Sequence, residues 1–152
     1  NIKADALDLD FGEMKFLNIN CLKVKNDCLD ISGAIVKGKN IVSKNAFDKG
    51  ISIGENSNVK IQNINLINNN IALAVKDGSF ADFKNINFKE NNYDIALFIK
   101  KKEFTKPKLV LDNIKNLDKK RILQSKNTIL IINNNLLEGS MEDDYINEII
   151  YK

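Results

Sequence analysis

The sequence contains no histidine and no tryptophan, one proline, one arginine and two cysteines. Without histidine, neither a Cys–His nucleophile pair nor an imidazole general base can exist. Two cysteines without histidine also cannot build a four-ligand zinc site or a disulfide framework. The missing residue types therefore exclude histidine-based catalysis and the usual zinc sites.

Long apolar runs and concentrated charge are also absent. No run of about 18 apolar residues occurs, so the sequence predicts no membrane-spanning helix. The 23 basic and 20 acidic residues are interspersed, apart from short basic runs at residues 100–102 and 119–121. Nucleic-acid binders concentrate basic charge and add arginines or aromatic residues, but Arg121 is the only arginine. We therefore expect solvated loop charge, and neither a nucleic acid nor a membrane as partner.

Asparagine, lysine and isoleucine dominate what is present, with 24, 22 and 22 copies in 152 residues. Asparagine disfavours helix interiors and isoleucine favours strands, so the composition is typical of a β protein. The length is sufficient for one domain with a core. Because the chain starts at Asn1 without a methionine or signal segment, we expect an excised domain or a processed product.

An internal repeat of about 22 residues is the strongest pattern. Asn-Ile pairs at residues 18–19, 40–41, 63–64, 85–86 and 113–114 are spaced by 22, 23, 22 and 28 residues. Around each pair, apolar residues alternate with the period of a half-buried strand. Another short strand precedes each set, at Leu7/Leu9, Leu29/Ile31, Ile51/Ile53, Leu73/Val75 and Leu97/Ile99.

A unit of this length cannot bury its own apolar face, but stacked units close a continuous core. The repeat thus predicts an all-β chain, a right-handed parallel β-helix of about five to six coils over residues 1–139. A leucine-rich-repeat horseshoe is the competing fold, and the Ile-rich alternation disfavours it. The asparagine column has two explanations, a ladder of amide hydrogen bonds between coils or the tolerance of asparagine for left-handed turns.

The end of the chain departs from the repeat. The 28-residue spacing before Asn113 predicts an inserted loop near residues 100–107. Residues 140–152 predict a short helix of the same domain, with Ser140 as N-cap. Its face to be buried would hold Tyr145 and Ile149, with Ile146 beside them. We expect this helix to cap the open end of the solenoid.

The two cysteines are expected on different faces. Cys21 falls in an inward column with Ser43, Leu66 and Phe88, and Cys28 is predicted to point outward. This placement argues against a disulfide between them.

Two stretches, residues 48–55 (DKGISIGE) and 76–79 (KDGS), resemble the recurrent turns of pectate-lyase-like right-handed β-helix proteins. Similar segments occur in large bacterial surface or secreted proteins, some of which carry a spore-coat-kinase-like domain beside the helix. The resemblance covers about residues 4–117. It implies an extracellular or cell-surface setting, neighbouring domains in a longer chain, and a carbohydrate ligand.

Candidate site residues lie on the outward positions of the first strand of each coil. One column runs Asp8, Asp30, Ser52, Ala74 and Phe98, and the next runs Asp10, Ser32, Gly54, Lys76 and Lys100. A third column of small residues, Ala6, Cys28, Gly50, Ala72 and Ala96, would form a flat shelf on which a polymer could lie.

Asp8 stacked on Asp30 is the most informative pair, because carboxylates one strand apart repel and raise a pKa or attract a cation. Catalysis would use Asp8 and Asp30, with Ca²⁺ as a conceivable ion, and Lys76 as the base. A binding groove would add Asp10, Asp48, Ser52, Glu55, Asp77 and Lys100. The plainest alternative is a solvated acidic patch balanced by Lys49 and Lys76.

The usual base of lyases in the resembling family is an arginine, and none lies in the repeats. We therefore expect a non-catalytic extracellular module that is structural, binds glycans, or both, without a cofactor. The alternative is a polysaccharide lyase or epimerase acting on an acidic sugar polymer. A third possibility is a solenoid that only spaces neighbouring domains.

Overall fold

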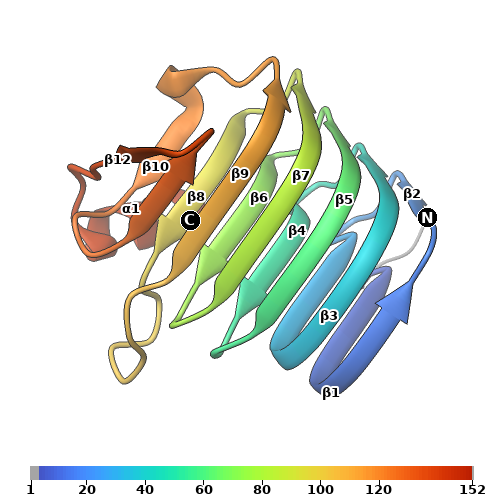
Figure 1. Ribbon diagram of the computed structural model, residues 1–152, viewed down its shortest axis with the longest axis horizontal. Coiled ribbons are helices and arrows are strands. Elements are labelled where there is room, and N and C mark those ends of the chain that lie inside the picture. The colour runs from blue at the N-terminus through green and yellow to red at the C-terminus, as the bar shows by residue number, and fades with distance from the viewer. Residues whose placement is uncertain (1–3, 152) are drawn as a thin grey trace.

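The computed structural model describes residues 4–151, which form a parallel β-solenoid of about six coils (Figure 1). The strands of the first coils are β1 (Leu7–Phe16), β2 (Ile19–Leu22), β3 (Leu29–Lys44), β4 (Lys49–Gly54), β5 (Asn58–Ile67), β6 (Ile71–Lys76) and β7 (Phe80–Lys89). The later elements are β8 (Tyr93–Phe98), β9 (Lys108–Lys115), the 3₁₀ turn η1 (Lys119–Arg121), β10 (Ile122–Gln124), β11 (Ile129–Ile132), β12 (Asn135–Leu137) and α1 (Asp143–Ile150).

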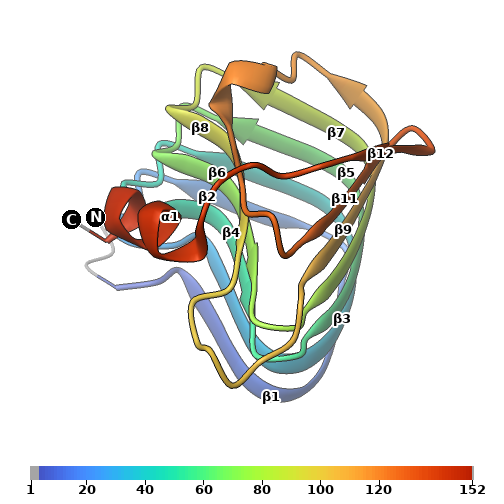
Figure 2. The same ribbon diagram turned by 90° about the vertical axis from the view of Figure 1, so that its left-hand side faces the viewer.

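Each central coil contributes to three faces. The first face holds the start of β1 and β3, then β4, β6, β8 and β10. The second face holds the middle of the long strands, at residues 12–16, 35–39, 58–62, 80–84 and 108–112, and then β11. The third face holds β2 and the ends of β3, β5, β7 and β9. Figure 2 looks along the stack and shows the coils bending around one interior.

The predicted columns are confirmed over the second and third faces. Val59 pairs with Ala81 and Ile61 with Phe83, and Ile64 lies between Ile41 and Ile86. These inward residues are fully buried in one continuous core. Like residues stack because successive coils repeat the same backbone path about 4.8 Å apart.

On the first face the predicted register is wrong at β8. Leu73 pairs with Ile95 and Val75 with Leu97, so Ala96 and Phe98, not Phe98 and Lys100, continue the outward columns. The run from Ile95 to Ile99 is apolar at every position, so two registers two residues apart satisfy the apolar pattern equally well. The hydrogen bonds of the preceding turn, Asn92 N to Asn69 O and Tyr93 N to Asn70 O, select one of them.

Both explanations of the asparagine column hold. Asn40, Asn63, Asn85 and Asn113 adopt φ between 53° and 60°, the left-handed region. Their amides also form a ladder, in which each Nδ2 donates to Oδ1 of the asparagine one coil earlier at 2.6–3.1 Å, beginning with Asn40 to Asn18. A left-handed corner with an amide in the ladder therefore repeats at these four residues, whereas Asn18 of the first coil joins the ladder without a positive φ.

The column of small residues does not form an outward shelf. Cys28 and Ala72 belong to the interior core, and a Cβ on Gly50 would lie 2.6 Å from the carbonyl oxygen of Ala72 and 3.1 Å from Leu66 Cδ2. The chain turns into the first face at these positions, so the alternation of the strand does not extend back to them. Small residues are needed there because one coil approaches the next closely.

Cys21 and Cys28 form a disulfide, contrary to the prediction, with their Cα atoms 5.7 Å apart. Both side chains are buried in the same interior cluster. The prediction failed because Cys28 points inward together with Leu29 rather than alternating with it. The bond ties the end of the first coil to the start of the second.

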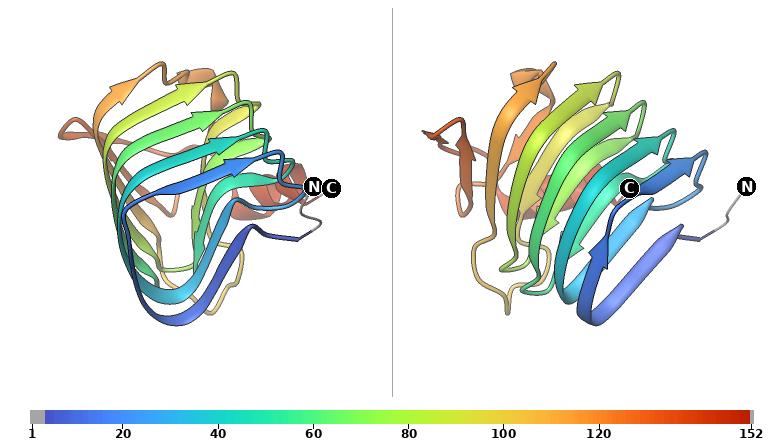
Figure 3. Two further views of the ribbon diagram at one scale, coloured as in Figure 1. Left: turned by 90° about the vertical axis from the view of Figure 1, so that its right-hand side faces the viewer. Right: turned by 45° about the vertical axis from the view of Figure 1, so that its right-hand side comes forward.

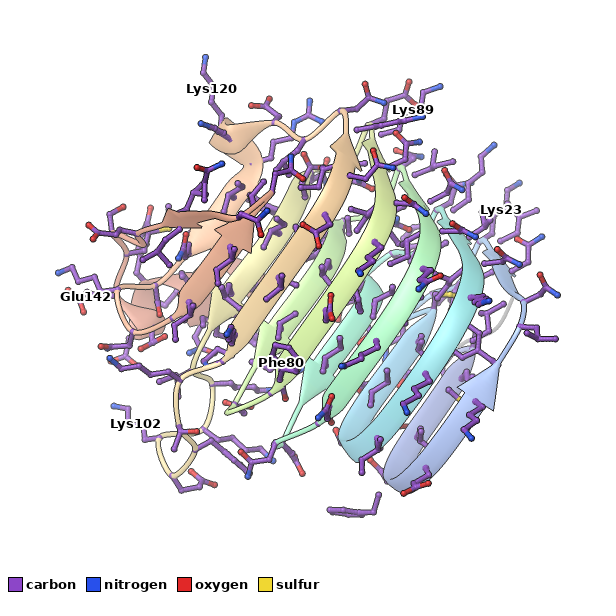
Figure 4. The ribbon with its side chains drawn as sticks, viewed as in Figure 1. Lys23, Phe80, Lys89, Lys102, Lys120 and Glu142 are labelled. Atoms are coloured by element: carbon purple, nitrogen blue, oxygen red, sulfur yellow. A yellow bond between two sulfur atoms is a disulfide. The ribbon has the colours of Figure 1, made fainter. Side chains whose placement is uncertain are left out.

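The insertion is confirmed as a loop between β8 and β9 that leaves the stack, with Lys102 near its tip (Figure 4). At the C-terminal end, β12 turns back on β11 as an antiparallel hairpin. This hairpin, rather than the helix, closes the end of the stack (Figure 1).

The C-terminal helix is present, but its start and its position differ from the prediction. Its buried face is partly as predicted, because Ile146 is buried and Ile149 partly buried, whereas Tyr145 is exposed. Glu142 is the N-cap and makes no side-chain capping bond. Ile146 and Ile150 are buried, whereas the Tyr145 side chain is 57% exposed. Together with Leu123, they pack on Ile71, Ala74, Ala96 and Phe98. The helix α1 thus lies on the outside of the first face, as Figure 2 shows.

Candidate functional site

The first-face columns bring the predicted carboxylates together. Asp8 pairs with Asp30, and Asp30 with Ser52. Partial desolvation, followed by the charges of Asp10, Asp30 and Asp5, raises the pKa of Asp8. The predicted effect of stacked acids is therefore present at Asp8, although its first cause is desolvation.

Most of this face is covered by the chain itself. Ser52, Ala74, Ala96 and Phe98 are fully buried, the last three beneath α1. Asp8 and Asp10 remain exposed on the first coil. The surface predicted to hold a polymer along several coils is thus open over the first coils only.

Lys76 lies close enough to Asp30 for an electrostatic interaction. Its ammonium Nζ donates to Ser52 Oγ at 2.8 Å. Burial lowers the pKa of Lys76, and the charge of Asp30 opposes that shift. Asp30 Oδ1 is buried and has no hydrogen-bond partner among residues 4–151. Of the predicted catalytic trio, Asp30 pairs with Asp8 of the preceding coil, and Lys76 donates to Ser52 of the following coil and interacts with Asp30 through its charge.

Lys49 forms the most buried ion pair near this site. Its Nζ lies 3.6 Å from Asp27 Oδ1 and 2.5 Å from Asp48 Oδ2. Burial raises the pKa of Asp27 to about 7, although the charge of Lys49 opposes the rise. The ammonium groups of Lys49 and Lys100 also lie 5.3 and 4.1 Å from the ring centroid of Tyr151.

The ring of Tyr151 therefore lies against both lysines. Partial burial, and then the surrounding carboxylates, of which Asp48 and Asp27 contribute most, raise the pKa of its phenol. Of the predicted binding residues, Asp48 and Lys100 are thus engaged by groups of the chain itself.

Two further predicted binding residues anchor the insertion loop. Asp77 Oδ1 accepts hydrogen bonds from the backbone N–H groups of Lys100 and Lys101, at 2.7 and 2.8 Å. Glu55 forms an ion pair with Lys101, and this hydrogen bond is the first cause that raises the pKa of Lys101. These contacts occupy Glu55 and Asp77 Oδ1, whereas Asp77 Oδ2 is buried and has no hydrogen-bond partner among residues 4–151.

Neither a metal cluster nor a spanning helix is found in the described part of the chain. Over residues 4–151, no three cysteine or acidic side chains are grouped as a metal ion requires. Within the same residues, no helix has the length and apolarity needed to traverse a bilayer. The Ca²⁺ hypothesis stays a prediction.

The third face presents a different and more open surface, which we call the asparagine face. It consists of the ladder at the start of the third strand, the strand residues Asn65 and Asn87 with Asn116, and the turn residues Asn45, Asn68, Asn70 and Asn92. Further hydrogen bonds from Nδ2 to Oδ1 connect its members. They run from Asn87 to Asn65 at 3.2 Å, Asn116 to Asn87 at 2.7 Å, Asn68 to Asn45 at 2.6 Å and Asn92 to Asn70 at 3.1 Å.

Two grooves follow this face, one at each end of the third strand. The first groove has a volume of about 620 Å³ and is lined by Asn63, Ile64, Asn65, Asn85, Ile86, Asn87, Asn113, Lys115 and Asn116. The second has a volume of about 420 Å³ and is lined by Lys23, Asn45, Ala46, Phe47, Asn68, Asn69, Asn70 and Asn92. Lys23, which lines the second groove, and Lys89 lie along the same edge of the stack in Figure 4.

Phe47 is the distinctive residue of the second groove. Its side chain is 71% exposed, yet its backbone N–H donates to the carbonyl of Val24 at 2.9 Å. The neighbouring Ala46 N–H donates to Asn69 Oδ1 at 2.9 Å, and Asn69 is itself buried and bonded to Ser43 and Asn91. An exposed aromatic ring is thus held on a rigid base beside a row of amides.

Sequence reasoning missed this second groove. The run Asn68-Asn69-Asn70 and the isolated aromatic residue Phe47, between Ala46 and Asp48, were the available signals. They were not informative by themselves because turns also favour asparagine, and the alternation of the strands stops before Phe47.

The comparisons with known proteins add no relative: no family model, no curated protein and no solved structure matches this chain.

Proposed function

We propose that this chain is a non-catalytic β-helix module that binds a polysaccharide along the asparagine face in an extracellular setting. The observation that carries the proposal is the exposed ring of Phe47 beside the amides of Asn45, Asn68, Asn70 and Asn92. An amide offers both a donor and an acceptor, as neighbouring sugar hydroxyls require. An aromatic ring supplies a flat apolar platform for the apolar side of a sugar ring.

The repetition of the face favours a polymer over a small ligand. Equivalent amides recur at each coil, at the spacing of about 4.8 Å between parallel strands. A chain of repeating sugars could meet the same set of groups several times, so that weak contacts add up.

The chemistry of the lining favours binding without turnover. Lys23 is the one ionisable side chain among the residues that line the second groove, and Lys115 is the one in the first. Asparagine amides do not titrate and cannot act as general acid or base. The disulfide between Cys21 and Cys28 supports the extracellular setting, because such bonds persist in oxidising compartments.

Titration of the protein with a panel of neutral and acidic polysaccharides tests the proposal, by calorimetry or affinity electrophoresis. Phe47→Ala should weaken binding at least tenfold. Phe11→Ala is the matched control, because the Phe11 side chain is 70% exposed but lies away from the asparagine face. Binding that is equal in the two variants, or no binding to any polysaccharide, would contradict the proposal.

A second candidate function, a polysaccharide lyase or epimerase, is favoured by one observation, the buried Lys76 with its lowered pKa beside Asp30. A lysine with a lowered pKa can remove a proton next to a sugar carboxylate. A screen for unsaturated or epimerised products, with and without Ca²⁺, tests it. Lys76→Ala should abolish turnover, and Lys60→Ala on the exposed second face should not.

A further inference from the structure

Lysines stack in a row on the exposed second face. Lys15 pairs with Lys37, and Lys37 pairs with Lys60, so the three side chains occupy one outward column of successive coils. All three are exposed. Figure 3 shows the strands that carry them, β1, β3 and β5, side by side from blue to green. Because parallel strands lie about 4.8 Å apart, three positive charges follow one line along the stack.

The sequence does not reveal this row. Lys15, Lys37 and Lys60 are 22 and 23 residues apart with acidic residues between them, so the charge is interspersed along the chain. One coil has the same length as this spacing, and the fold therefore collects charges that the sequence disperses. These lysines also lie within strands rather than in solvated loops.

The row is not neutralised within the protein. Among residues 4–151, no ion pair engages the ammonium groups of Lys15, Lys37 and Lys60. Like charges directly opposite each other on neighbouring strands destabilise a sheet. Lys37 has such a neighbour on both sides, at a strand spacing shorter than the Debye length of about 8 Å at physiological ionic strength. The free protein therefore contains a repulsion that a bound anion would relieve.

Protection of an exposed strand edge does not explain the row. Lysines on edge strands discourage unwanted pairing between molecules. Lys37 and Lys60 instead lie on inner strands, because β3 pairs with β1 and β5, and β5 pairs with β3 and β7. Lysine is also depleted in strands in general. Its recurrence in the middle of the sheet points to a ligand.

The row borders a groove that no carboxylate lines. The groove has a volume of about 290 Å³ and is lined by Lys15, Phe16, Leu17, Lys37, Gly38, Lys39, Lys60 and Gln62. Four lysines thus share one hollow, in which Gln62 adds an amide and Leu17 an exposed apolar contact. The row ends at the next coil, where Asp82 pairs with Lys60. The unbroken row is therefore three coils long.

The shape of this groove favours a polymer chain as its occupant. A straight row of equally spaced charges matches a chain that carries one acidic group on each repeating unit, so that several weak contacts add up. A concave groove admits a narrow chain, whereas the surface of a bilayer cannot enter it.

The residues that the groove lacks disfavour a nucleic acid. Proteins that bind single strands offer aromatic rings on which bases stack, and phosphate recognition favours arginine. No arginine lines the groove, and its one aromatic residue, Phe16, packs against the interior core. Lysine ammonium groups suffice as point charges for the acidic groups of a glycan.

We propose that this groove, which we call the lysine groove, is a second binding site that holds an anionic glycan, a chain of sugars or polyols with an acidic group on each unit. Successive acidic groups lie between the ammonium groups of successive coils and offset the repulsion around Lys37. The site does not rest on the proposed function, because it shares no lining residue with the grooves of the asparagine face.

Calorimetric titration with dextran, carboxymethyl dextran and dextran sulfate tests the lysine groove. The two anionic forms should bind with an affinity that falls as salt is added, and Lys37→Glu should weaken this binding about tenfold. Lys84→Glu is the matched control, because Lys84 is exposed on the same face but pairs with Gln62 and Asp112. It changes the net charge equally and should weaken binding less than about twofold.

Unfolding of the free protein supplies a second measurement. Lys37→Gln removes the repulsion between Lys37 and its neighbours Lys15 and Lys60, so this variant should unfold at a higher urea concentration than the wild type. The same variant should bind dextran sulfate more weakly. A loss of affinity together with a gain in stability separates a binding role from a structural one. A variant less stable than the wild type would show that Lys37 serves the fold instead.

Three binding results would overturn the proposal. They are equal losses in Lys37→Glu and Lys84→Glu, no binding of either anionic dextran, and Lys37-dependent binding of a single-stranded oligonucleotide or of anionic phospholipid vesicles that exceeds the binding of both dextrans. Phe47→Ala should leave the salt-dependent binding of dextran sulfate in place. A failure of the lysine groove and a failure of the asparagine face can therefore be told apart.

Discussion

Asn63 Nδ2 donates to Asn40 Oδ1 at 2.9 Å, across the boundary between two coils. Asn63 also adopts a φ of 60°, so one residue serves as a rung of the ladder and as a left-handed corner. The two roles can be separated by substitution, because glycine retains the backbone freedom of asparagine but not its amide.

Asn63→Ala should lower the free energy of unfolding by about 2–3 kcal/mol, because the side-chain hydrogen bonds of the ladder are lost and alanine is strained in the left-handed conformation. Asn63→Gly should lower it by roughly half as much, since glycine accepts that backbone. Urea unfolding of both variants measures the difference. Equal losses would show that the left-handed corner contributes little.

Removal of the disulfide should destabilise the chain by about 2–3 kcal/mol, the value for closure of a short loop. The double variant Cys21→Ala, Cys28→Ala makes the comparison by urea unfolding. A reducing agent should lower the stability of the wild type and leave the double variant unchanged. Stability that does not respond to reductant in the wild type would contradict this expectation.

Two glycines of β4 should differ in their response to a methyl group. At Gly50 a Cβ would lie 2.6 Å from the backbone oxygen of Ala72, which cannot move without displacing a strand. At Gly54 the nearest atom is Cε of the flexible Lys76 side chain, 3.1 Å away. Gly50→Ala should therefore cost about 1–3 kcal/mol and Gly54→Ala less, as thermal or urea unfolding will show. The reverse order would contradict the close approach of the coils at Gly50.

The stability of the chain should depend on pH through Asp27. Burial raises its pKa in the folded state to about 7, from an ordinary value of 3.8. Between these values the folded chain retains a proton that the unfolded chain has released, so the contribution of Asp27 to stability is greatest below about pH 4 and is lost as pH rises to about 7. Each pKa unit by which the folded and unfolded states differ corresponds to about 1.4 kcal/mol in the free energy of unfolding.

Asp27→Asn removes this titration. Urea unfolding of the wild type and the variant from pH 4 to pH 8 isolates the contribution of Asp27 as the difference between the two curves. The wild type should lose stability relative to the variant across that range. Parallel curves would show that Asp27 keeps an ordinary pKa.

The repeat made the register of the second and third faces predictable. Alternation around Ile41, Ile64 and Ile86 has one solution, because a shift by one residue would expose every apolar side chain. The same reasoning placed Asp8 beside Asp30. It failed at Cys28 and at Phe98, where the chain turns or where two registers satisfy the pattern equally.

The candidate site was predictable in its residue columns but not in its accessibility. Asp30, Ser52 and Lys76 lie together as expected, yet α1 and Tyr151 cover much of their face. The helix pattern predicted that apolar residues would be buried, without indicating the surface that would bury Ile146. Phe47 became informative only when both the exposure of its side chain and the hydrogen bond of its backbone N–H were known.

The sequence by itself determined the coil, its period, the asparagine ladder and the inserted loop, because each depends on contacts between residues one repeat apart. Only the tertiary structure decided where α1 docks, that Cys21 meets Cys28, and which face stays open. Those outcomes depend on the fit of surfaces that follow no period along the chain, such as Ile146 on Ala74 and Phe98. A repeat therefore specifies its own stack, and the packing of non-repeating segments on that stack specifies the accessible surface.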